Sequence, residues 1–381
     1  MKRLLALFLS VIVMLLFALP VIGQEAAQTE EPAATEEAGD AVKYDPTVCF
    51  AAAANNDRMV QFEAKEGPYV IGVSNSYIGN AWRTQMIQMA QAFVQTDAIA
   101  PLVEDLQIVS TGDDVEAQIA AMDNMISAGV DAIVLNAINP TSFDAVVERA
   151  TDAGIIVVSF DGIVDAPDAI IVNEDQVEFG AVMARDLAER MGGKGNVIMV
   201  NGVPGTSVDS DRNAGAKAVF AEYPDIKVAA ELEGRWDSGT AQTVVADYLA
   251  TQPQVDGVWV QGGGPGVIQA FVDAGYEDLP PMAGEAENGF RMAMGTGQIE
   301  GISVGQTPGM IDVSIQAALE LLQGRELPRV ISMPLPVVTS EDIEEGVHYF
   351  PELPVDFFTP IKIPVCGVDL DPEAILAVKV Q

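Results

Sequence analysis

The chain has 381 residues, of which 49% are hydrophobic, and its 56 acidic and 19 basic residues give a formal net charge of -37. This balance argues against nucleic acid and against highly anionic ligands, because no basic patch is available to neutralise phosphates. A neutral or cationic solute is the favourable partner. A single core stops growing near about 250–300 residues, so the length predicts two domains.

The first 23 residues have the pattern of a secretory signal peptide. Lys2 and Arg3 precede an apolar run from Leu4 to Leu19, which is short for a membrane span. We expect cleavage near Gly23, with retention as an N-terminal anchor as the alternative. The acidic residues 24–43 are expected to form a disordered linker, and residues 44–67 an N-terminal extension. The protein is therefore expected to be exported, to the periplasm or the cell surface.

The sequence contains two cysteines, Cys49 and Cys366, near the two ends of the mature chain. In an exported protein this pattern predicts one disulfide that joins the terminal segments. Two separate buried thiols are the alternative, because the sequence does not give the distance between them.

From Tyr69 onward, short strands rich in Val and Ile alternate with amphipathic helices. Near-continuous apolar strands in this order are typical of parallel sheets covered by helices on both faces. The alternation runs through two successive halves, which predicts an α/β fold with two lobes. The predicted strands are 70–73, 107–110, 132–136, 155–161, 196–202, 227–234, 257–261, 301–306 and 335–338.

Polar and aromatic residues gather where the predicted strands end. In open α/β sheets, ligands bind beyond the carboxyl ends of the strands. Carboxylates and amides bind hydroxyls, and aromatic rings pack on the C–H face of a sugar, so the set predicts a polyol site. Individually, each residue can also be an ordinary turn or cap, as in the Asp161-Gly162 pair. The candidates are Tyr77, Asn80, Trp82, Arg83, Asn136, Asp161, Asp209, Trp236, Gln261, Glu285 and Gln306.

The sequence offers little for catalysis. The single histidine, His348, has no cluster of metal-ligating residues around it, and neither a G-x-S-x-G elbow nor a Walker motif occurs. We therefore expect no enzymatic activity, no cofactor and no metal. A hydrolase is the alternative, and it would have to use His348.

Several segments in one order resemble the periplasmic sugar-binding proteins of the ribose and galactofuranose type, the substrate-capturing components of ABC importers. The segments are IGVSNSYIGNAWR, GVDAIVLNAINPTSFDAVVERATDAGIIVVSFD, GVPGTSVDSDRNAGAKAVF, VDGVWVQGGG and SVGQTP, within Tyr69–Val338. The resemblance implies two Rossmann-like lobes joined by three crossovers, with the sugar between them. The first lobe would comprise 68–173 and 306–335, and the second 174–305 and 336–381.

The resemblance also assigns roles by position. Trp82 and Trp236 match the two stacking aromatics, and Arg83 completes the Trp-Arg pair of galactofuranose-type members. Asp161 and Gln306 match the Asp that ends a strand and the Gln near the last hinge crossing.

Departures from the ribose-type pattern disfavour ribose itself. Gly162 stands where those members have Arg, their helix Arg after GTS falls on Ser210, and Gly262 and Gly263 replace an Asn-Asp pair. We expect a monomer that captures a neutral sugar or polyol and passes it to a membrane permease. The acidic residues Glu285 and Glu287 leave room for an amino sugar or another cationic polyol. The alternative is a secreted sensor that presents a bound signal to a receptor.

Overall fold

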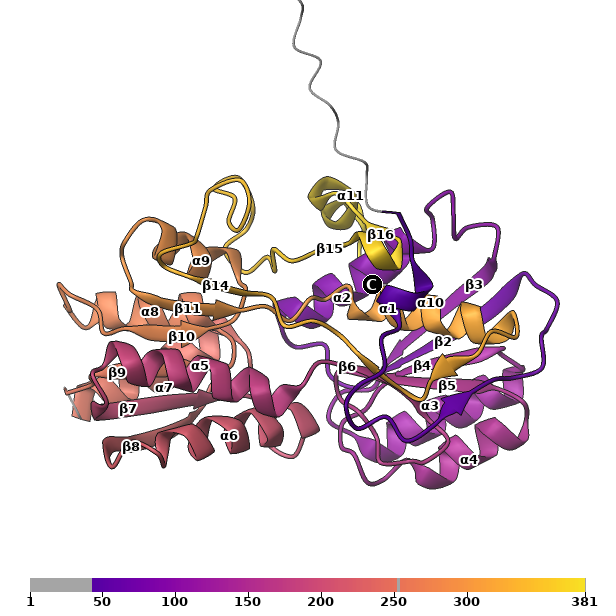
Figure 1. The fold of residues 1–381 in the computed structure, drawn as a ribbon, viewed down its shortest axis with the longest axis horizontal. Helices are drawn as coiled ribbons and strands as arrows, with labels where there is room; N and C mark the ends of the chain where they lie inside the picture. Colours follow the sequence, from indigo (N-terminus) through magenta and orange to yellow (C-terminus); the bar gives the residue numbers. More distant parts are fainter. Residues whose placement is uncertain (1–42, 252–253, 381) are drawn as a thin grey trace, which may run out of the picture. The chain divides into compact units, whose positions relative to one another are not determined.

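The structure, a computed structural model, describes residues 43–251 and 254–380. The expected signal peptide, and the expected linker up to residue 42, lie outside the described residues. The described chain forms two α/β lobes, each built on a six-stranded sheet with helices on both faces (Figure 1). Among the helices of the described residues, none has the length and apolar character needed to cross a membrane.

The first lobe has a fully parallel sheet in the order β13-β6-β5-β4-β2-β3. Its central strands are completely buried, which explains their Val- and Ile-rich sequences. One face packs against α2 and α10, and the other against α3 and α4. The elements are β2 (Tyr69–Asn75), α2 (Ala81–Phe93), β3 (Val103–Ser110), α3 (Val115–Ala128), β4 (Ala132–Asn136), α4 (Asp144–Asp152), β5 (Ile156–Phe160), β6 (Ile170–Asn173), α10 (Met310–Leu322) and β13 (Val330–Ser332).

The second lobe repeats this plan in the order β14-β11-β10-β9-β7-β8, with only β14 antiparallel to its neighbour. Helices α5 and α6 cover one face, and α7, α8 and α9 the other. The elements are α5 (Gln176–Arg190), β7 (Lys194–Asn201), α6 (Ser207–Phe220), β8 (Asp225–Glu233), α7 (Ser238–Thr251), β9 (Gly257–Val260), α8 (Gly264–Asp273), β10 (Met282–Gly284), α9 (Asn288–Gly295), β11 (Gly301–Val304) and β14 (Val337–Thr339).

These two sheets confirm the predicted α/β fold with two lobes. Strands β6, β10 and β13 are absent from the predicted set, because each has only three or four residues and shows no clear periodicity.

The chain passes between the lobes at residues 174–175, 305–309 and 333–336, which are the three expected crossovers. It then passes once more. Residues 340–353 remain with the second lobe, where Ser340 N donates to Gly301 O (2.9 Å) and Asn288 Nδ2 to Phe350 O (2.8 Å). The C-terminal residues then return to the first lobe.

This return corrects the expectation that residues 336–381 belong wholly with the second lobe. The apolar side chains of Phe357, Phe358, Ile361, Val368 and Ile375 are buried in the same core cluster as α2 and α10. That burial removes apolar surface from water and explains why the tail leaves the second lobe. The tail contains β15 (Lys362–Ile363), the short 3-10 helix Pro364–Cys366, β16 (Val368–Asp369) and α11 (Pro372–Ala377).

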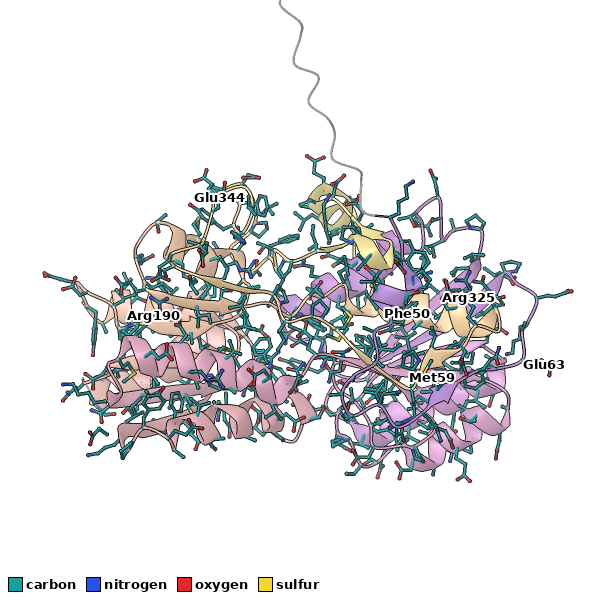
Figure 2. All side chains as sticks on the ribbon, in the orientation of Figure 1. Phe50, Met59, Glu63, Arg190, Arg325 and Glu344 are labelled. Atoms are coloured by element: carbon teal, nitrogen blue, oxygen red, sulfur yellow. A yellow bond between two sulfur atoms is a disulfide. The ribbon has the colours of Figure 1, made fainter. Side chains whose placement is uncertain are left out.

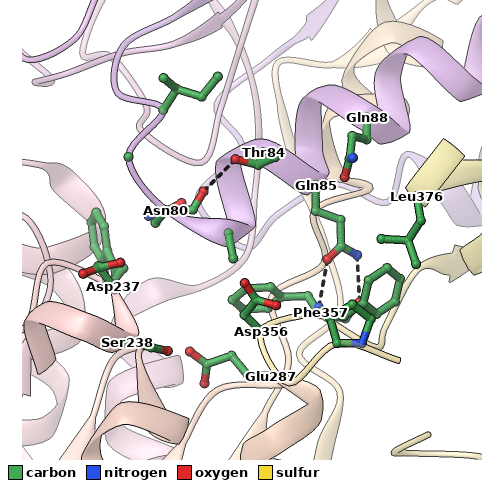
Figure 3. Close-up of a pocket in the computed structure, with 16 residues that line it drawn as sticks. Asn80, Thr84, Gln85, Gln88, Asp237, Ser238, Glu287, Asp356, Phe357 and Leu376 are labelled. Carbon is green, nitrogen blue, oxygen red and sulfur yellow. Dashed lines mark hydrogen bonds between the residues drawn. The ribbon is translucent and has the colours of Figure 1, made fainter. Parts of the chain in front are cut away.

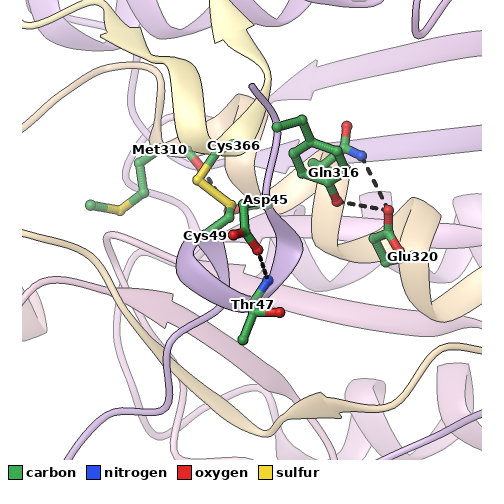
Figure 4. Close-up of a disulfide and its surroundings, with 9 residues drawn as sticks. Asp45, Thr47, Cys49, Met310, Gln316, Glu320 and Cys366 are labelled. Atoms are coloured by element: carbon green, nitrogen blue, oxygen red, sulfur yellow. Dashed lines mark hydrogen bonds between the residues drawn. A yellow bond between two sulfur atoms is a disulfide. The ribbon is translucent and has the colours of Figure 1, made fainter. Parts of the chain in front are cut away.

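A disulfide between Cys49 and Cys366 confirms the predicted pairing (Figure 4). Cys49 ends α1 (Pro46–Cys49), and its Cα lies 4.9 Å from that of Cys366 across a sequence separation of 317. Phe50, labelled in Figure 2, is buried beside it in the core cluster of the first lobe. A small two-stranded sheet of β1 (Met59–Val60) and β12 (Leu327–Pro328) adds to the same lobe. Both ends of the described chain are therefore fixed to the first lobe.

Candidate functional site

A small cavity lies between side chains that come from both lobes and from the segments joining them. Its space is about 20 Å³, room for about one water molecule. The lining residues are Asn80, Trp82, Arg83, Asp161, Val208, Arg212, Trp236, Glu285, Gln306 and Phe358.

The N-terminus of α2 forms the wall from the first lobe. Asn80 has an extended backbone, and its Oδ1 accepts a hydrogen bond from Arg83 N (2.9 Å), so it caps the helix. This cap sets the direction of the first helical turn, from which Trp82 and Arg83 reach the cavity. The Trp82 indole donates from Nε1 to Gln306 O (3.1 Å) in a crossover.

Asp161 directly follows β5 and is held by its neighbours from two sides. Its backbone has a φ of 53°, an uncommon conformation for a residue other than glycine. Arg83 Nη2 lies 3.1 Å from its Oδ2, and Asn136 Nδ2 donates to the same oxygen (2.9 Å). Burial lowers the pKa of Arg83, whereas the Asp161 carboxylate acts in the opposite direction. Arg83 is a cation, because the guanidinium group of arginine stays protonated in proteins.

Arg212 on α6 is the most highly connected side chain of the cavity, with an exposed fraction of 1%. Its Nη1 donates to Glu285 Oε1 (2.5 Å), and its Nη2 donates to Gln306 Oε1. Its Nε donates to Gln176 Oε1 (2.8 Å), and the guanidinium carbon lies 3.7 Å from the centre of the Phe179 ring. Burial raises the pKa of Glu285 to about 7, although the cation of Arg212 opposes the shift.

Trp236 forms the wall from the second lobe, just after β8. Its φ is 55°, and its Nε1 donates to Gln261 Oε1 (3.1 Å), which fixes the ring. The ring lies against Gly202, where a Cβ atom would overlap Cε2 of the indole. Gly202 is therefore needed for the ring to occupy this position.

Most of the predicted site residues line the cavity, and four do not. Asn136 donates to Asp161 from behind the cavity wall. Gln261 donates from Nε2 to Asp209 Oδ1 (3.0 Å), and these two residues also lie behind the wall. Tyr77 instead lies near the guanidinium of Arg235, 5.8 Å from its ring centre. The roles of these residues in ligand binding remain predictions.

The sequence reasoning missed Val208, Arg212 and Phe358. Arg212 lies in the segment GVPGTSVDSDRNAGAKAVF, which carries part of the resemblance, but the resemblance places the expected arginine at Ser210. Val208 and Arg212 are four residues apart on α6, so they lie on the same face of the helix, and both are buried. This spacing is the signal that could have identified them. Phe358 follows the stretch that carries the resemblance, so no signal pointed to it.

A larger open pocket of about 460 Å³ adjoins the cavity and shares Asn80, Trp236 and Phe358 with it (Figure 3). Asp237, Glu287 and Asp356 give it an acidic lining. Glu287 Oε1 accepts from Gly263 N (2.5 Å), and burial raises the pKa of Glu287 to about 8.

Within residues 43–251 and 254–380, no group of three or more His, Cys, Asp or Glu side chains is arranged to hold a metal ion. His348 accepts a hydrogen bond at Nδ1 from the backbone N of Glu344 (3.1 Å). His348 is therefore a hydrogen-bond acceptor within a local turn.

A cavity between two α/β lobes, joined by several crossovers, defines the class of two-lobed solute-binding proteins. The chain belongs to the periplasmic binding protein domain family, which it matches over residues 71–326. This membership confirms the resemblance noted from the sequence. The family consists of sugar- and polyol-binding proteins of ABC transporters, not of enzymes.

Two curated relatives illustrate the relationship. The xylitol-binding protein of Mycolicibacterium smegmatis is 28% identical over 244 residues, which cover 63% of this chain and 70% of the relative. The ribose import binding protein of Bacillus subtilis is 23% identical over 277 residues, which cover 72% of this chain and 88% of the relative.

Solved structures show the same relationship. An ABC transporter solute-binding protein from Thermobispora bispora is 33% identical with a TM-score of 0.68, and the match covers 72% of this chain and 86% of that one. A periplasmic solute-binding protein from Actinobacillus succinogenes, with bound D-allose, is 25% identical with a TM-score of 0.62. The match covers 72% of this chain and 98% of that one.

Proposed function

We propose that this protein is an exported solute-binding protein of an ABC importer, which captures a neutral sugar or polyol between its lobes and delivers it to a permease. The observation that carries the proposal is the composition of the cavity. Two indoles, Trp82 and Trp236, line it together with the charged and amide groups of Arg83, Asp161 and Gln306. Aromatic faces suit the C–H surface of a polyol, and the polar groups suit its hydroxyls.

The charges of the cavity favour a neutral ligand. Two guanidinium groups, Arg83 and Arg212, face two carboxyl groups, Asp161 and Glu285, in close pairs. Because the opposite charges are already balanced, a charged ligand would leave one group unpaired in a buried site. Relatives named for xylitol and ribose, and a neighbour holding D-allose, support the same ligand class.

The mechanism follows from how little space the cavity has. The side chains hydrogen-bond to one another across it, so a sugar enters only after the lobes separate. The bound sugar then replaces those contacts with its own hydroxyls and favours a closed state that the permease recognises. The difference in contacts between the two states supplies the free energy for closure.

The experiment is calorimetric titration of the purified protein with xylitol, D-ribose, D-allose and myo-inositol. We compare wild type with Trp82→Ala, Asp161→Ala and the control Asp168→Ala, which removes an exposed aspartate of the same lobe. We expect at least a ten-fold loss of affinity in the first two variants and none in the control. Unchanged affinity in both site variants would overturn the proposed site, and a wild type that binds none of these or other polyols would overturn the function.

A further inference from the structure

The segment from Phe350 to Thr359 connects the two lobes and lies outside residues 71–326, the part matched by the family. It is the fourth passage of the described chain between the lobes. One of its side chains, Phe358, lines the inner cavity and the outer pocket, with an exposed fraction of 3%.

On the second lobe, the start of α9 holds the segment. Asn288 donates from Nδ2 to Phe350 O (2.8 Å) and Leu353 O (3.0 Å), and from its backbone N to Phe357 O (2.7 Å). Gly289 N donates to Val355 O (2.7 Å). These bonds satisfy backbone groups that a buried irregular segment would otherwise leave unpaired.

On the first lobe, Gln85 of α2 holds the residue that faces the cavity. Its Nε2 donates to Phe358 O and its Oε1 accepts from Phe358 N, both at 2.8 Å, as the two dashed lines in Figure 3 show. The chain then reaches Cys366, which the disulfide joins to Cys49. The backbone of Phe358 is thus fully paired, and its ring is held at the junction of the cavity and the pocket.

We propose that Phe358 is a ligand-contacting residue that determines specificity in the cavity, in addition to the two tryptophans. The inference rests on the proposed function. A phenyl ring offers no hydrogen-bond partner, so it accepts an apolar C–H face and disfavours a ligand that places a hydroxyl there. The ligand is therefore a polyol or sugar whose face toward the C-terminal segment carries C–H groups.

The test compares Phe358→Leu with Phe357→Leu, a matched control. Both phenylalanines have an exposed fraction of 3% in the same core cluster, but Phe357 does not line the inner cavity. We titrate both variants with xylitol, D-ribose, D-allose and myo-inositol and record melting temperatures. For Phe358→Leu we expect at least a ten-fold loss of affinity and a change of three-fold or more in the ratios between ligands. For Phe357→Leu we expect a similar loss of thermal stability, a less than three-fold loss of affinity and unchanged ratios.

Gln85→Ala provides a second variant that leaves the ring intact but removes the two hydrogen bonds to Phe358. For this variant we expect the same change in the affinity ratios between ligands, with a smaller loss of affinity.

If wild type binds and Asp161→Ala abolishes binding, while Phe358→Leu and Gln85→Ala keep wild-type affinity and ratios, this inference is wrong and the proposed function stands. Equal effects of Phe357→Leu and Phe358→Leu would likewise overturn it. A wild type that binds no polyol would overturn the function and this inference together.

Discussion

Gln306 donates a hydrogen bond from Nε2 to Oδ1 of Asp161 at 2.5 Å. Its Oε1 accepts from Arg212, so three side chains form a continuous connection from α6 of the second lobe, through a crossover, to the end of β5 in the first. Buried polar groups need partners, and these side chains partner one another. A ligand hydroxyl that replaces one of these three side chains as a hydrogen-bond partner leaves the remaining side chains paired.

Arg212→Lys is expected to weaken polyol binding at least ten-fold, which corresponds to about 1.4 kcal/mol. A lysine ammonium has no planar fork and cannot serve Gln176, Glu285 and Gln306 together. Calorimetric titration measures the loss. Arg185→Lys is the control, since Arg185 makes an exposed ion pair at 3.6 Å with Glu178. Wild-type affinity in Arg212→Lys would refute a role for this guanidinium in the site.

Gly202→Ala is expected to weaken binding about ten-fold, by displacing the Trp236 ring that a Cβ atom would overlap. The change of position removes stacking on the ligand without replacing any residue that is proposed to contact it. Gly239→Ala is the matched control, because the nearest atom to its new Cβ would be Asp237 Oδ1 at 3.5 Å, an ordinary contact. Titration together with tryptophan fluorescence checks the prediction, and identical behaviour of the two variants would contradict it.

The free energy of unfolding is expected to fall as the pH rises from about 4.5 to about 8. Burial raises the pKa of Glu285 to about 7 and that of Glu287 to about 8, and it also raises that of Glu174 well above its usual value. In this range the folded state binds more protons than the unfolded state, so stability is fully present below the unfolded pKa and is lost as these groups ionise.

Urea unfolding of wild type and Glu287→Gln at pH 5 and pH 8.5 tests this assignment. We expect Glu287→Gln to lose less free energy of unfolding between pH 5 and pH 8.5 than wild type does, because the variant lacks the ionisation of Glu287. The control is Glu344→Gln, an exposed glutamate labelled in Figure 2, which should keep the wild-type dependence. An equally steep decline in Glu287→Gln would show that Glu287 does not titrate in this range.

Removing the disulfide with Cys49→Ser and Cys366→Ser together is expected to lower the free energy of unfolding by about 2–5 kcal/mol. The bond closes a loop across a sequence separation of 317, so its loss frees a large ensemble of unfolded conformations. Urea unfolding with and without a reductant measures the effect, and reductant should shift wild type toward the double variant. A double variant as stable as oxidised wild type would refute this contribution.

The sequence predicted much of the fold because burial on both faces makes the strands of a parallel sheet continuous in Val and Ile. Strands β4 and β5 are found within a residue of their predicted ends, whereas β10 has three residues and no pattern to detect. The walls of the cavity were also predictable in part. Trp82 and Asp161 follow strands at the carboxyl edge of the sheet, where ligands bind in this fold class.

The sequence by itself determined the alternation of strands and helices, the acidic charge, the disulfide expected from two cysteines and the family resemblance. The alternation depends on periodicity over neighbouring residues, and the charge and the expected disulfide depend on composition, whereas the resemblance rests on segments that are similar to those of a known family. Only the tertiary structure decided that Arg212 rather than Ser210 reaches the cavity, that Asn136, Asp209 and Gln261 lie behind its walls, and that the tail returns to place Phe358 there. These outcomes depend on which segments far apart in the chain pack together, and that is set by the summed burial and hydrogen bonding of the whole fold.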